Sequence, residues 1–449
     1  MKWWKILTAV MVLSLACAPA NAEPSVERKK NIFTIAEGVN DDILAQVKAE
    51  MGQVNQQELG FVLEEIADGD LTKLCAAYPG MYALTIKDSE ELSSLAPVAG
   101  LKSLRKIMLQ GENMVADFTP LAGLTEMLDL DVASDEMGPD LKWMSGLTKL
   151  TGIRVMSGEK LTSIEGIPAL PGLGSIAISG ASLKDLSPLL ILPALKEVNL
   201  RGCKIADLSP LAQLPALEDL DLYGATVEDF SPLAACPKLR AVTYYATEDA
   251  DYSTLGTLTQ VEELKGGMTE LEDISWVANL QNLKKFSVFK EQITDYSPLA
   301  KTKVEDLQIW SMSTPDNNLA SLAGVTSLTK LKLWDLKKTT NFESLGGLVN
   351  LKHLIIDTVN KDGGVVDLAF LAKTPELNNL EINDSALANA EAIASCQKLS
   401  NVTLLKVTGV TSLAFLKKLP ALKTVLVSKG AFPEAELSGF GKNVRVNQR

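Results

Sequence analysis

Apolar residues recur along this chain in a short pattern, Leu-x-x-Leu-x-Leu, that returns every 21 to 26 residues. A clear copy is formed by Leu217, Leu220 and Leu222. A fixed period of this length is the signature of a leucine-rich repeat solenoid, in which every repeat contributes one strand and packs only against its neighbours. The pattern therefore predicts an α/β solenoid with a concave parallel β-sheet.

Within each copy, apolar residues occupy positions 1, 4 and 6, and positions 3, 5 and 7 alternate with them. Because successive side chains of a strand point to opposite faces, we expect positions 3, 5 and 7 to face solvent on the concave sheet. We recognise about sixteen copies over residues 79–428. Their first residues are Met81, Leu104, Met127, Leu150, Leu173, Leu195, Leu217, Leu239, Val261, Leu283, Val304, Leu328, Leu351, Leu377, Leu399 and Leu422.

A proline-containing phrase follows many of these strands, as in Leu-Ser-Pro-Leu at residues 208–211. Proline cannot donate a backbone hydrogen bond and favours the start of a turn or helical segment. We therefore expect short 3₁₀ helices or turns on the convex side of each repeat. Trp143 and Trp276 stand at the proline's place in their repeats, and we interpret both as convex packing residues.

Different patterns precede and follow the repeats. Residues 23–33 are interpreted as a flexible leader and residues 34–78 as a helical N-terminal cap. One helix is expected to begin after Asn40. A second is expected over 55–67, because Asn55 and Glu58 match a capping box and Leu59, Val62, Leu63 and Ile66 fall on one helical face. Residues 429–449 are interpreted as a C-terminal cap, with a strand in the alternating segment at 443–446.

The first residues have the features of a secretory signal. Lys2 and Lys5 precede an apolar stretch over residues 6–16. Ala-Asn-Ala at 20–22 matches the small-residue cleavage site of a signal peptide. We expect a signal peptide over 1–22 and an exported protein, periplasmic or secreted. Lipidation at Cys17 is the alternative. The apolar stretch is too short to span a membrane, and no transmembrane segment is expected.

Composition narrows the class of partner. The formal net charge of −13 argues against a nucleic-acid binder, because phosphate recognition needs a basic surface. Four cysteines remain after the signal segment, scattered along the repeats, and we interpret them as small buried hydrophobic residues. Cys203 with Cys236 is the only disulfide pairing considered. No metal or cofactor motif is found, and we expect a monomer.

The repeat resembles a known family at this point. Leu-x-x-Leu-x-Leu followed by Ile-Ala-Asp-Leu-Ser-Pro-Leu-Ala at 205–212 is similar to the 22-residue repeat of bacterial internalin-type leucine-rich repeat proteins, over residues 81 to about 427. The resemblance implies a curved right-handed solenoid that binds other proteins on its concave face. The family's usual turn Asn is mostly replaced, by Ala181, Cys203 and Ala225. We recognise neither an immunoglobulin-like module nor a wall-sorting signal, so we expect a binding solenoid rather than a surface-anchored invasin.

Position 7 carries a column of aromatic residues. Six consecutive strands have Tyr223, Tyr245, Gly267, Phe289, Trp310 and Trp334 there, in a chain with only 5% aromatic residues. Exposed aromatic rings in a row form an apolar patch that soluble monomers usually avoid unless it binds something. The alternative is that the rings stack on one another and stiffen the sheet. The gap at Gly267 predicts a recess in the column.

Charged residues are expected beside this column. Two acidic residues flank Tyr223, and four lysines flank the later rings. The lysine grouping favours an acidic partner on an otherwise acidic protein, or is an ordinary solvated surface. These predicted partner-binding residues are Asp219, Asp221, Lys265, Lys285, Lys330 and Lys332.

Catalysis is not expected. The chain contains one histidine, His353, at an outward position and without an assigned partner. The common hydrolase, metalloprotease and phosphate-loop motifs are absent from the sequence. We therefore expect an exported, non-enzymatic scaffold that recognises a protein partner. Binding of a carbohydrate or cell-wall glycan through the same aromatic residues is the alternative.

Overall fold

A computed structural model describes residues 24–244, 251–267, 271–289, 293–310, 317–336, 339–359 and 364–449. The expected signal segment and Tyr245 lie outside these residues. The chain divides into two compact units, which are described separately. The first comprises residues 1–137 and 143–150, and the second comprises residues 138–142 and 151–449.

The first unit combines a small sheet with two helices. Strand β1 is antiparallel to β2, and β2 to β6 follow one another in parallel. The strands are β1 (Ser25–Lys29), β2 (Ile32–Ala36), β3 (Gly60–Glu64), β4 (Ala83–Lys87), β5 (Lys106–Gln110) and β6 (Asp129–Ser134). The helices are α1 (Asp41–Glu50) and α2 (Asp68–Ala77), with 3₁₀ turns η1 (Met51–Gln53), η2 (Gln56–Glu58), η3 (Ala96–Gly100) and η4 (Thr119–Leu121).

The expected helix after Asn40 is present as α1, and the Asn40 side chain accepts a hydrogen bond from the backbone N–H of Ile43. The second expected helix, over 55–67, is wrong. Asn55 caps only the 3₁₀ turn η2, and the chain then forms strand β3. Alternate residues 59, 61 and 63 are buried there, so a period of two outweighs the helical reading.

Two further features of this region differ from expectation. Residues 25–29 and 32–36, interpreted as part of a flexible leader and of the cap, form the hairpin of β1 and β2. A helix not expected from the sequence, α2, begins at Asp68, directly after the segment over 55–67. The hairpin places β1, whose residues Glu27 to Lys29 are charged, along the first strand of the parallel ladder. Charged side chains on such an edge discourage pairing with other chains.

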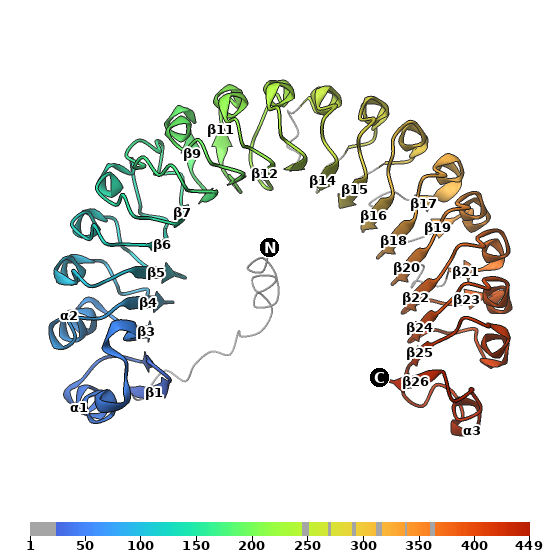
Figure 1. Cartoon of the computed structure of the whole chain (residues 1–449), viewed down its shortest axis with the longest axis horizontal. Coiled ribbons are helices and arrows are strands. Elements are labelled where there is room, and N and C mark those ends of the chain that lie inside the picture. The colour runs from blue at the N-terminus through green and yellow to red at the C-terminus, as the bar shows by residue number, and fades with distance from the viewer. Residues whose placement is uncertain are drawn as a thin grey trace. The chain divides into compact units, whose positions relative to one another are not determined.

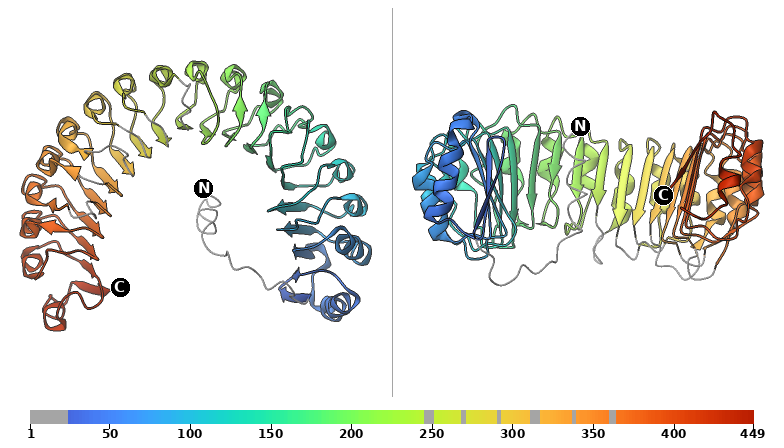
Figure 2. Two further views of the ribbon diagram at one scale, coloured as in Figure 1. Left: turned by 180° about the vertical axis from the view of Figure 1, so that it is seen from behind. Right: turned by 90° about the horizontal axis from the view of Figure 1, so that it is seen from below.

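The second unit is a ladder of short parallel strands on its inner side, with 3₁₀ helices on its outer side (Figures 1 and 2). One strand per repeat confirms the leucine-rich repeat solenoid. The main strands are β7 (Gly152–Ser157), β8 (Ser175–Ser179), β10 (Glu197–Asn199), β12 (Asp219–Leu222), β13 (Ala241–Tyr244), β14 (Glu263–Gly267), β15 (Lys285–Phe289), β16 (Asp306–Trp310), β18 (Lys330–Trp334), β20 (His353–Asp357), β22 (Asn379–Asn383), β24 (Asn401–Leu405), β25 (Thr424–Val427) and β26 (Arg445–Gln448).

Short elements complete the repeats. Two-residue strands pair between neighbouring repeats: β9 (Ser182–Leu183), β11 (Lys204–Ile205), β17 (Asn317–Asn318), β19 (Thr339–Thr340), β21 (Val366–Asp367) and β23 (Leu387–Ala388). The helical turns are η5 (Lys142–Met144), η6 (Ser187–Ile191), η7 (Ser209–Gln213), η8 (Ser231–Ala235), η9 (Tyr252–Thr257), η10 (Ser275–Asn279), η11 (Ser297–Lys301), η12 (Leu319–Gly324), η13 (Phe342–Gly347), η14 (Ala369–Lys373), η15 (Ala390–Ser395), η16 (Ala414–Lys418) and α3 (Glu434–Leu437).

The inward positions form the core as the pattern predicts. Leu217, Leu220 and Leu222 are at most 1% exposed. Each buried leucine side chain contributes about 1.5–3 kcal/mol to stability. Register is therefore strongly specified, because a one-residue slip would turn every such side chain to solvent.

Most outer 3₁₀ helices of the second unit are preceded by an aspartate whose side chain accepts a hydrogen bond from a backbone N–H at the start of the helix. The repeat pattern does not predict these aspartates. Asp207, for example, accepts a hydrogen bond from the backbone N–H of Ser209 at 2.7 Å, immediately before Pro210. Hydrogen bonds from Ser209 lower the pKa of Asp207. The cap satisfies a donor that the short helix leaves unpaired. Equivalent caps in the second unit are Asp185, Asp229, Asp251, Asp273, Asp295 and Asp367.

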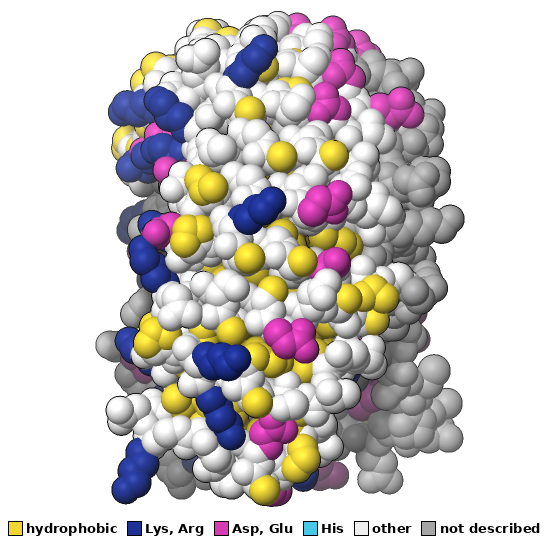
Figure 3. Space-filling view, turned by 90° about the vertical axis from the view of Figure 1, so that its right-hand side faces the viewer, with side chains coloured by type: hydrophobic (Ala, Val, Ile, Leu, Met, Phe, Trp, Pro, Cys, Tyr) yellow, Lys and Arg dark blue, Asp and Glu magenta, His cyan; other side chains and the backbone are white. Residues whose placement is uncertain are grey.

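On the outer face of the later repeats, Lys and Arg are most frequent along one margin, with others across the middle and several Asp and Glu among them (Figure 3). Lysines lie in the last turn of several 3₁₀ helices, as Lys301, Lys373 and Lys417 do, and the capping aspartates lie at the opposite ends. This arrangement matches the partial charges at helix ends. The outer face is thus a mixed, solvated surface.

Other packing expectations are met. Trp276 lies in η10 and is 7% exposed, and Trp143 lies in η5 with its ring stacked on Phe118. The cysteines at 75, 203, 236 and 396 are buried and free, so the Cys203–Cys236 disulfide does not form. The last strand, β26, pairs in parallel with β25. Within the described residues, no helix is both long and apolar enough to cross a membrane.

Candidate binding face

The aromatic side chains at position 7 lie on the solvent-facing side of the strand ladder, opposite to the buried core and the 3₁₀ helices. Strand register places Gly267, Phe289, Trp310 and Trp334 side by side on β14, β15, β16 and β18. Trp310 is 38% exposed, and the side chains of Phe289 and Trp334 are partly buried. We call Phe289, Trp310 and Trp334 the aromatic patch. Tyr223, 40% exposed, occupies the same position on an earlier repeat.

The rings of the aromatic patch touch one another at steep angles. The ring centroids of Phe289 and Trp310 are 5.6 Å apart with an interplanar angle of 55°. Those of Trp310 and Trp334 are 4.2 Å apart at 69°, an edge-to-face contact. Such pairs contribute about 0.5–1.5 kcal/mol each. They hold the rings in fixed orientations, but they do not form one flat platform.

The expected recess at Gly267 is not present, because Phe289 covers this residue. Gly267 is buried, and a Cβ atom there would lie 2.7 Å from the Cβ of Phe289. The glycine therefore gives the phenylalanine room to lean toward β14. The aromatic patch begins at this contact, and Gly267 forms its floor on that side.

The neighbouring residue, Gly266, is a glycine because of packing in the core. Gly266 stands where the repeat pattern has an inward apolar residue, and the fully buried Tyr244 of the preceding repeat fills that space. A Cβ atom at Gly266 would overlap the Tyr244 ring. One large side chain thus replaces two smaller ones, and the repeat loses its position-6 residue.

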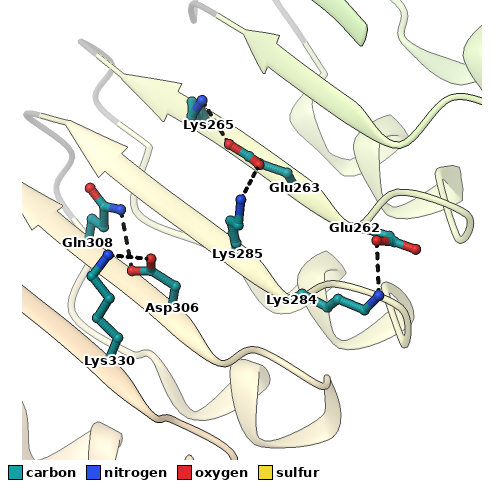
Figure 4. Close-up of polar contacts among 8 residues, drawn as sticks. All are labelled: Glu262, Glu263, Lys265, Lys284, Lys285, Asp306, Gln308 and Lys330. Atoms are coloured by element: carbon teal, nitrogen blue, oxygen red, sulfur yellow. Dashed lines mark hydrogen bonds and ion pairs between the residues drawn. The ribbon is translucent and has the colours of Figure 1, made fainter. Parts of the chain in front are cut away.

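Ion pairs occupy positions 3 and 5 next to the aromatic patch (Figure 4). Glu263 accepts from Lys265 at 2.8 Å and from Lys285 at 2.9 Å. Burial alone would raise the pKa of Glu263, but the two lysines outweigh it and lower that pKa. The hydrogen bond to Glu263 also raises the pKa of Lys285. Both predicted lysines therefore already have a carboxylate partner.

On the next two strands, β16 and β18, one of the two lysines has a carboxylate partner among the described residues and the other does not. Lys330 pairs with Asp306 at 3.0 Å, and the Gln308 amide donates to the same carboxylate (Figure 4). Lys332 instead places its ammonium 4.9 Å from the centroid of the Trp334 ring, a cation–π contact. Burial, followed by the charge of Lys330, lowers the pKa of Lys332.

The residues around Tyr223 are organised differently from the prediction. Asp221 is only 4% exposed and accepts from the Arg201 side chain at 2.8 Å and from the Tyr223 backbone N–H at 3.0 Å. The Arg201 guanidinium lies 5.5 Å from the Tyr223 ring centroid. Asp221 therefore holds Arg201 and the strand end in place, and its carboxylate is not a solvent-facing contact.

Asp219 lies among other acids. Burial raises the pKa of Asp219 to about 6, with Glu197, Asp221 and Glu263 adding to the effect and Lys265 opposing it. Because its folded pKa is above the unfolded value, protonation of Asp219 stabilises the folded protein as pH falls from above 6 toward 4.

Asp219→Asn should consequently raise the free energy of unfolding at pH 7.5 by about 1 kcal/mol, a value reduced for the solvent screening of a partly exposed group. The variant and the parent should become equally stable near ~pH 3, below the unfolded pKa, where Asp219 is protonated in both folded and unfolded chains. Urea denaturation at the two pH values measures this difference. Equal stability at pH 7.5 would contradict the assigned burial cost.

His353, the one histidine of the chain, is exposed on β20 opposite Lys330 in the register. Burial of its ring and the charges of Lys330 and Lys352 lower its pKa. The imidazole is therefore mainly neutral at physiological pH. We find no contact in the described part of the chain that would make it a general base.

Sequence reasoning missed several side chains of this face. Asp357 and Asn383 continue position 7 after Trp334, and the Asn383 amide donates to Asp357 at 3.0 Å. Asp306 and Glu263, at position 3, balance the predicted lysines. Reading all outward positions as columns would have identified these residues, because the register that exposes the aromatic rings exposes them too.

The class of protein follows from this architecture: it is a leucine-rich repeat solenoid with an aromatic patch on its strand face. Residues 193–235 match the sequence model of the family described as Leucine Rich repeats (2 copies). No curated protein sequence matches the chain.

Similar solved structures include internalins. An internalin from Listeria monocytogenes is 23% identical, with a TM-score of 0.45, over 76% of this chain and 85% of that one. The functional domain of InlJ from the same organism is 18% identical, with a TM-score of 0.41, over 76% and 72%. A leucine-rich repeat protein of Leptospira interrogans is 12% identical, with a TM-score of 0.45, over 89% of each chain.

Proposed function

We propose that this protein is an exported, non-enzymatic scaffold that binds a protein partner through the strand face of its second unit, with the aromatic patch as the centre of contact. The observation that carries the proposal is Trp310, a tryptophan 38% exposed on a strand whose backbone is fixed on both sides. Tryptophan and tyrosine dominate the binding energy of many protein interfaces. A solenoid presents such residues on a stiff frame, so little ordering entropy is lost on binding.

The geometry favours a protein over the alternative glycan ligand. Stacking on sugar rings needs broad, exposed ring faces. Neighbouring rings of the aromatic patch are tilted by 55° and 69°, and one face of Trp334 is already occupied by Lys332. Tilted rings leave both edges and faces for an irregular apolar surface, which side chains of a protein partner can fill.

The ionic neighbours add specificity. Ion pairs lie beside the aromatic patch, in which the carboxylates are partly buried and Lys265 and Lys285 are exposed. Their members are Glu263, Lys265, Lys285, Asp306 and Lys330. Charged pairs at the border of an interface contribute little affinity by themselves, but they disfavour mismatched partners and guide orientation. The predicted binding residues on β14 to β18 thus form one continuous surface. Asp219 lies on β12 and Tyr223 directly follows that strand, two strands away from β14.

Trp310→Ala with Trp334→Ala should weaken partner binding at least ~100-fold, because each tryptophan at an interface centre commonly contributes 2 kcal/mol or more. The partner is first captured from native lysate or a culture surface by the chain without residues 1–22, then identified by mass spectrometry. Its affinity for parent and variant is measured by biolayer interferometry, beside a glycan array.

A matched control replaces exposed apolar residues on the outer face. Ile191 and Val349 are 44% and 46% exposed and lie away from the strands. Ile191→Ala with Val349→Ala should leave the affinity within about twofold of the parent. Circular dichroism confirms that all variants are folded. Unchanged capture by the tryptophan variant would refute the aromatic patch as the contact, and patch-dependent binding on the glycan array alone would favour the alternative ligand.

A further inference from the structure

Positive charge exceeds negative charge at positions 3 and 5 of β14, β15, β16 and β18, although the protein as a whole has a net charge of −13. Asp357 lies next to Trp334 on the following strand, β20. Two carboxylates, Glu263 and Asp306, meet three lysines there: Glu263 is shared by Lys265 and Lys285, and Asp306 is taken by Lys330. Lys332 adds a fourth ammonium group. On these four strands the local excess is therefore opposite in sign to the net charge of the protein, which favours an acidic ligand.

Lys332 is the group in this set whose charge is least compensated. No carboxylate among the described residues forms an ion pair with it, and its ammonium lies over Trp334 instead. Lys330 is two residues away on the same strand face and is already occupied by Asp306. Lys332 and Gln308 are partners in the register, two residues before the Trp310–Trp334 pair on the same two strands.

An anion placed here would gain from several features at once. A partly buried ammonium beside a second lysine is stabilised when a carboxylate approaches, and the burial lowers the local dielectric and strengthens that attraction. The tilted rings next to it bury apolar surface of whatever carries the carboxylate. The Lys332 ammonium and the rings of Trp310 and Trp334 are therefore close enough for neighbouring residues of one ligand to contact both.

We propose that the aromatic patch and Lys332 together form a subsite for an acidic peptide segment of the partner, in which an Asp or Glu side chain pairs with Lys332 while a neighbouring apolar side chain packs on Trp310 and Trp334. This proposal rests on the proposed protein-binding function and specifies the chemistry that the partner presents. His353, neutral at physiological pH, lies beside Lys330 and can donate a further hydrogen bond to the same segment.

The probe is a library of random linear peptides displayed on phage, selected on the full chain and counter-selected on the Trp310→Ala/Trp334→Ala variant. We expect the selected peptides to be enriched in Asp or Glu next to an aromatic or aliphatic residue. For synthetic copies of these peptides, Lys332→Gln should raise the dissociation constant about tenfold or more, measured by calorimetry at low salt.

The matched control is Lys284→Gln. Lys284 immediately precedes β15 and pairs with Glu262 at 3.0 Å, apart from the ion pairs of Glu263 and Asp306 (Figure 4). It should change the dissociation constant by less than about twofold. Replacing the peptide's acidic residue by its amide should weaken binding to the parent chain and have no further effect on Lys332→Gln, because the pair is then already broken.

The outcomes separate this inference from the proposed function. Peptides that need the tryptophans but lack acidic residues, or that bind Lys332→Gln as tightly as the parent, overturn the acidic subsite and leave the protein-binding function standing. Failure to select any peptide whose binding depends on Trp310 and Trp334 overturns both. Enrichment of acidic residues with equal losses in Lys332→Gln and Lys284→Gln shows only general attraction and also overturns the subsite.

Discussion

Gly266→Ala should lower the free energy of unfolding by about 3 kcal/mol, near the upper end of the usual cost of overpacking. The added methyl group would overlap the ring of Tyr244, which is completely buried and also contacts Phe230 edge-on at 6.3 Å between centroids. The ring cannot move outward without opening the core between two repeats. Urea denaturation followed by circular dichroism measures the loss.

The same pair gives a rescue that distinguishes this cause from a general intolerance of β14. Tyr244→Leu alone removes the ring and leaves a cavity, which costs about 2–4 kcal/mol. Combined with Gly266→Val it restores the ordinary apolar position 6 in both repeats. The double variant should therefore be more stable than the sum of the single changes by ~2 kcal/mol or more. Additive losses would show that the two residues do not share one space.

Gly180→Ala should also destabilise the second unit strongly, by about 3 kcal/mol. Gly180 has a φ of +79°, and a Cβ atom there would overlap the backbone carbonyl oxygen of Ser157 on the neighbouring repeat. Two costs combine: an L-residue in the left-handed region, and a clash with backbone that cannot rotate away. The midpoint of urea denaturation reports the change.

Gly224 supplies a control at the same repeat position. Its φ is +73°, but the nearest atom to a Cβ there is 3.6 Å away, an ordinary van der Waals contact. Gly224→Ala retains the conformational cost without the clash and should destabilise by about 1 kcal/mol. A loss as large as that of Gly180→Ala would mean that the backbone conformation, and not the contact with Ser157, dominates at both sites.

The repeat region was predictable because its signal is repeated. A single Leu-x-x-Leu-x-Leu segment is ambiguous, but the recurrence fixes which positions are buried, and the register of β14 to β18 follows directly. The region before the repeats has no such reinforcement. Leu59, Phe61 and Leu63 alternate as a strand, yet Leu59, Val62 and Ile66 also fit a helix, and a real cap at Asn55 favoured the wrong alternative.

The sequence predicts which face of the sheet carries the candidate site, but it does not predict the contacts that the side chains make there. The side of the sheet on which Trp310 and Trp334 lie follows from the register. The burial of Asp221 does not, because it depends on Arg201 reaching across from the neighbouring strand. Likewise, the sequence offered lysines at 265 and 285 as free charges, whereas both share Glu263. A long charged side chain can reach several possible partners, and the sequence pattern does not show which of these contacts forms.

The shared space of Tyr244 and Gly266 has a consequence for how such an array can diversify. Solenoids are commonly thought to lengthen and shorten by copying or deleting whole modules. If the repeat of Tyr244 were followed by a repeat with an ordinary apolar residue at position 6, that side chain would clash with the Tyr244 ring. If the repeat of Gly266 were preceded by a repeat with an ordinary leucine at position 6, the space at Gly266 would be left as a cavity. The two modules are therefore structurally coupled, and we expect exchange or deletion of either one alone to destabilise the array.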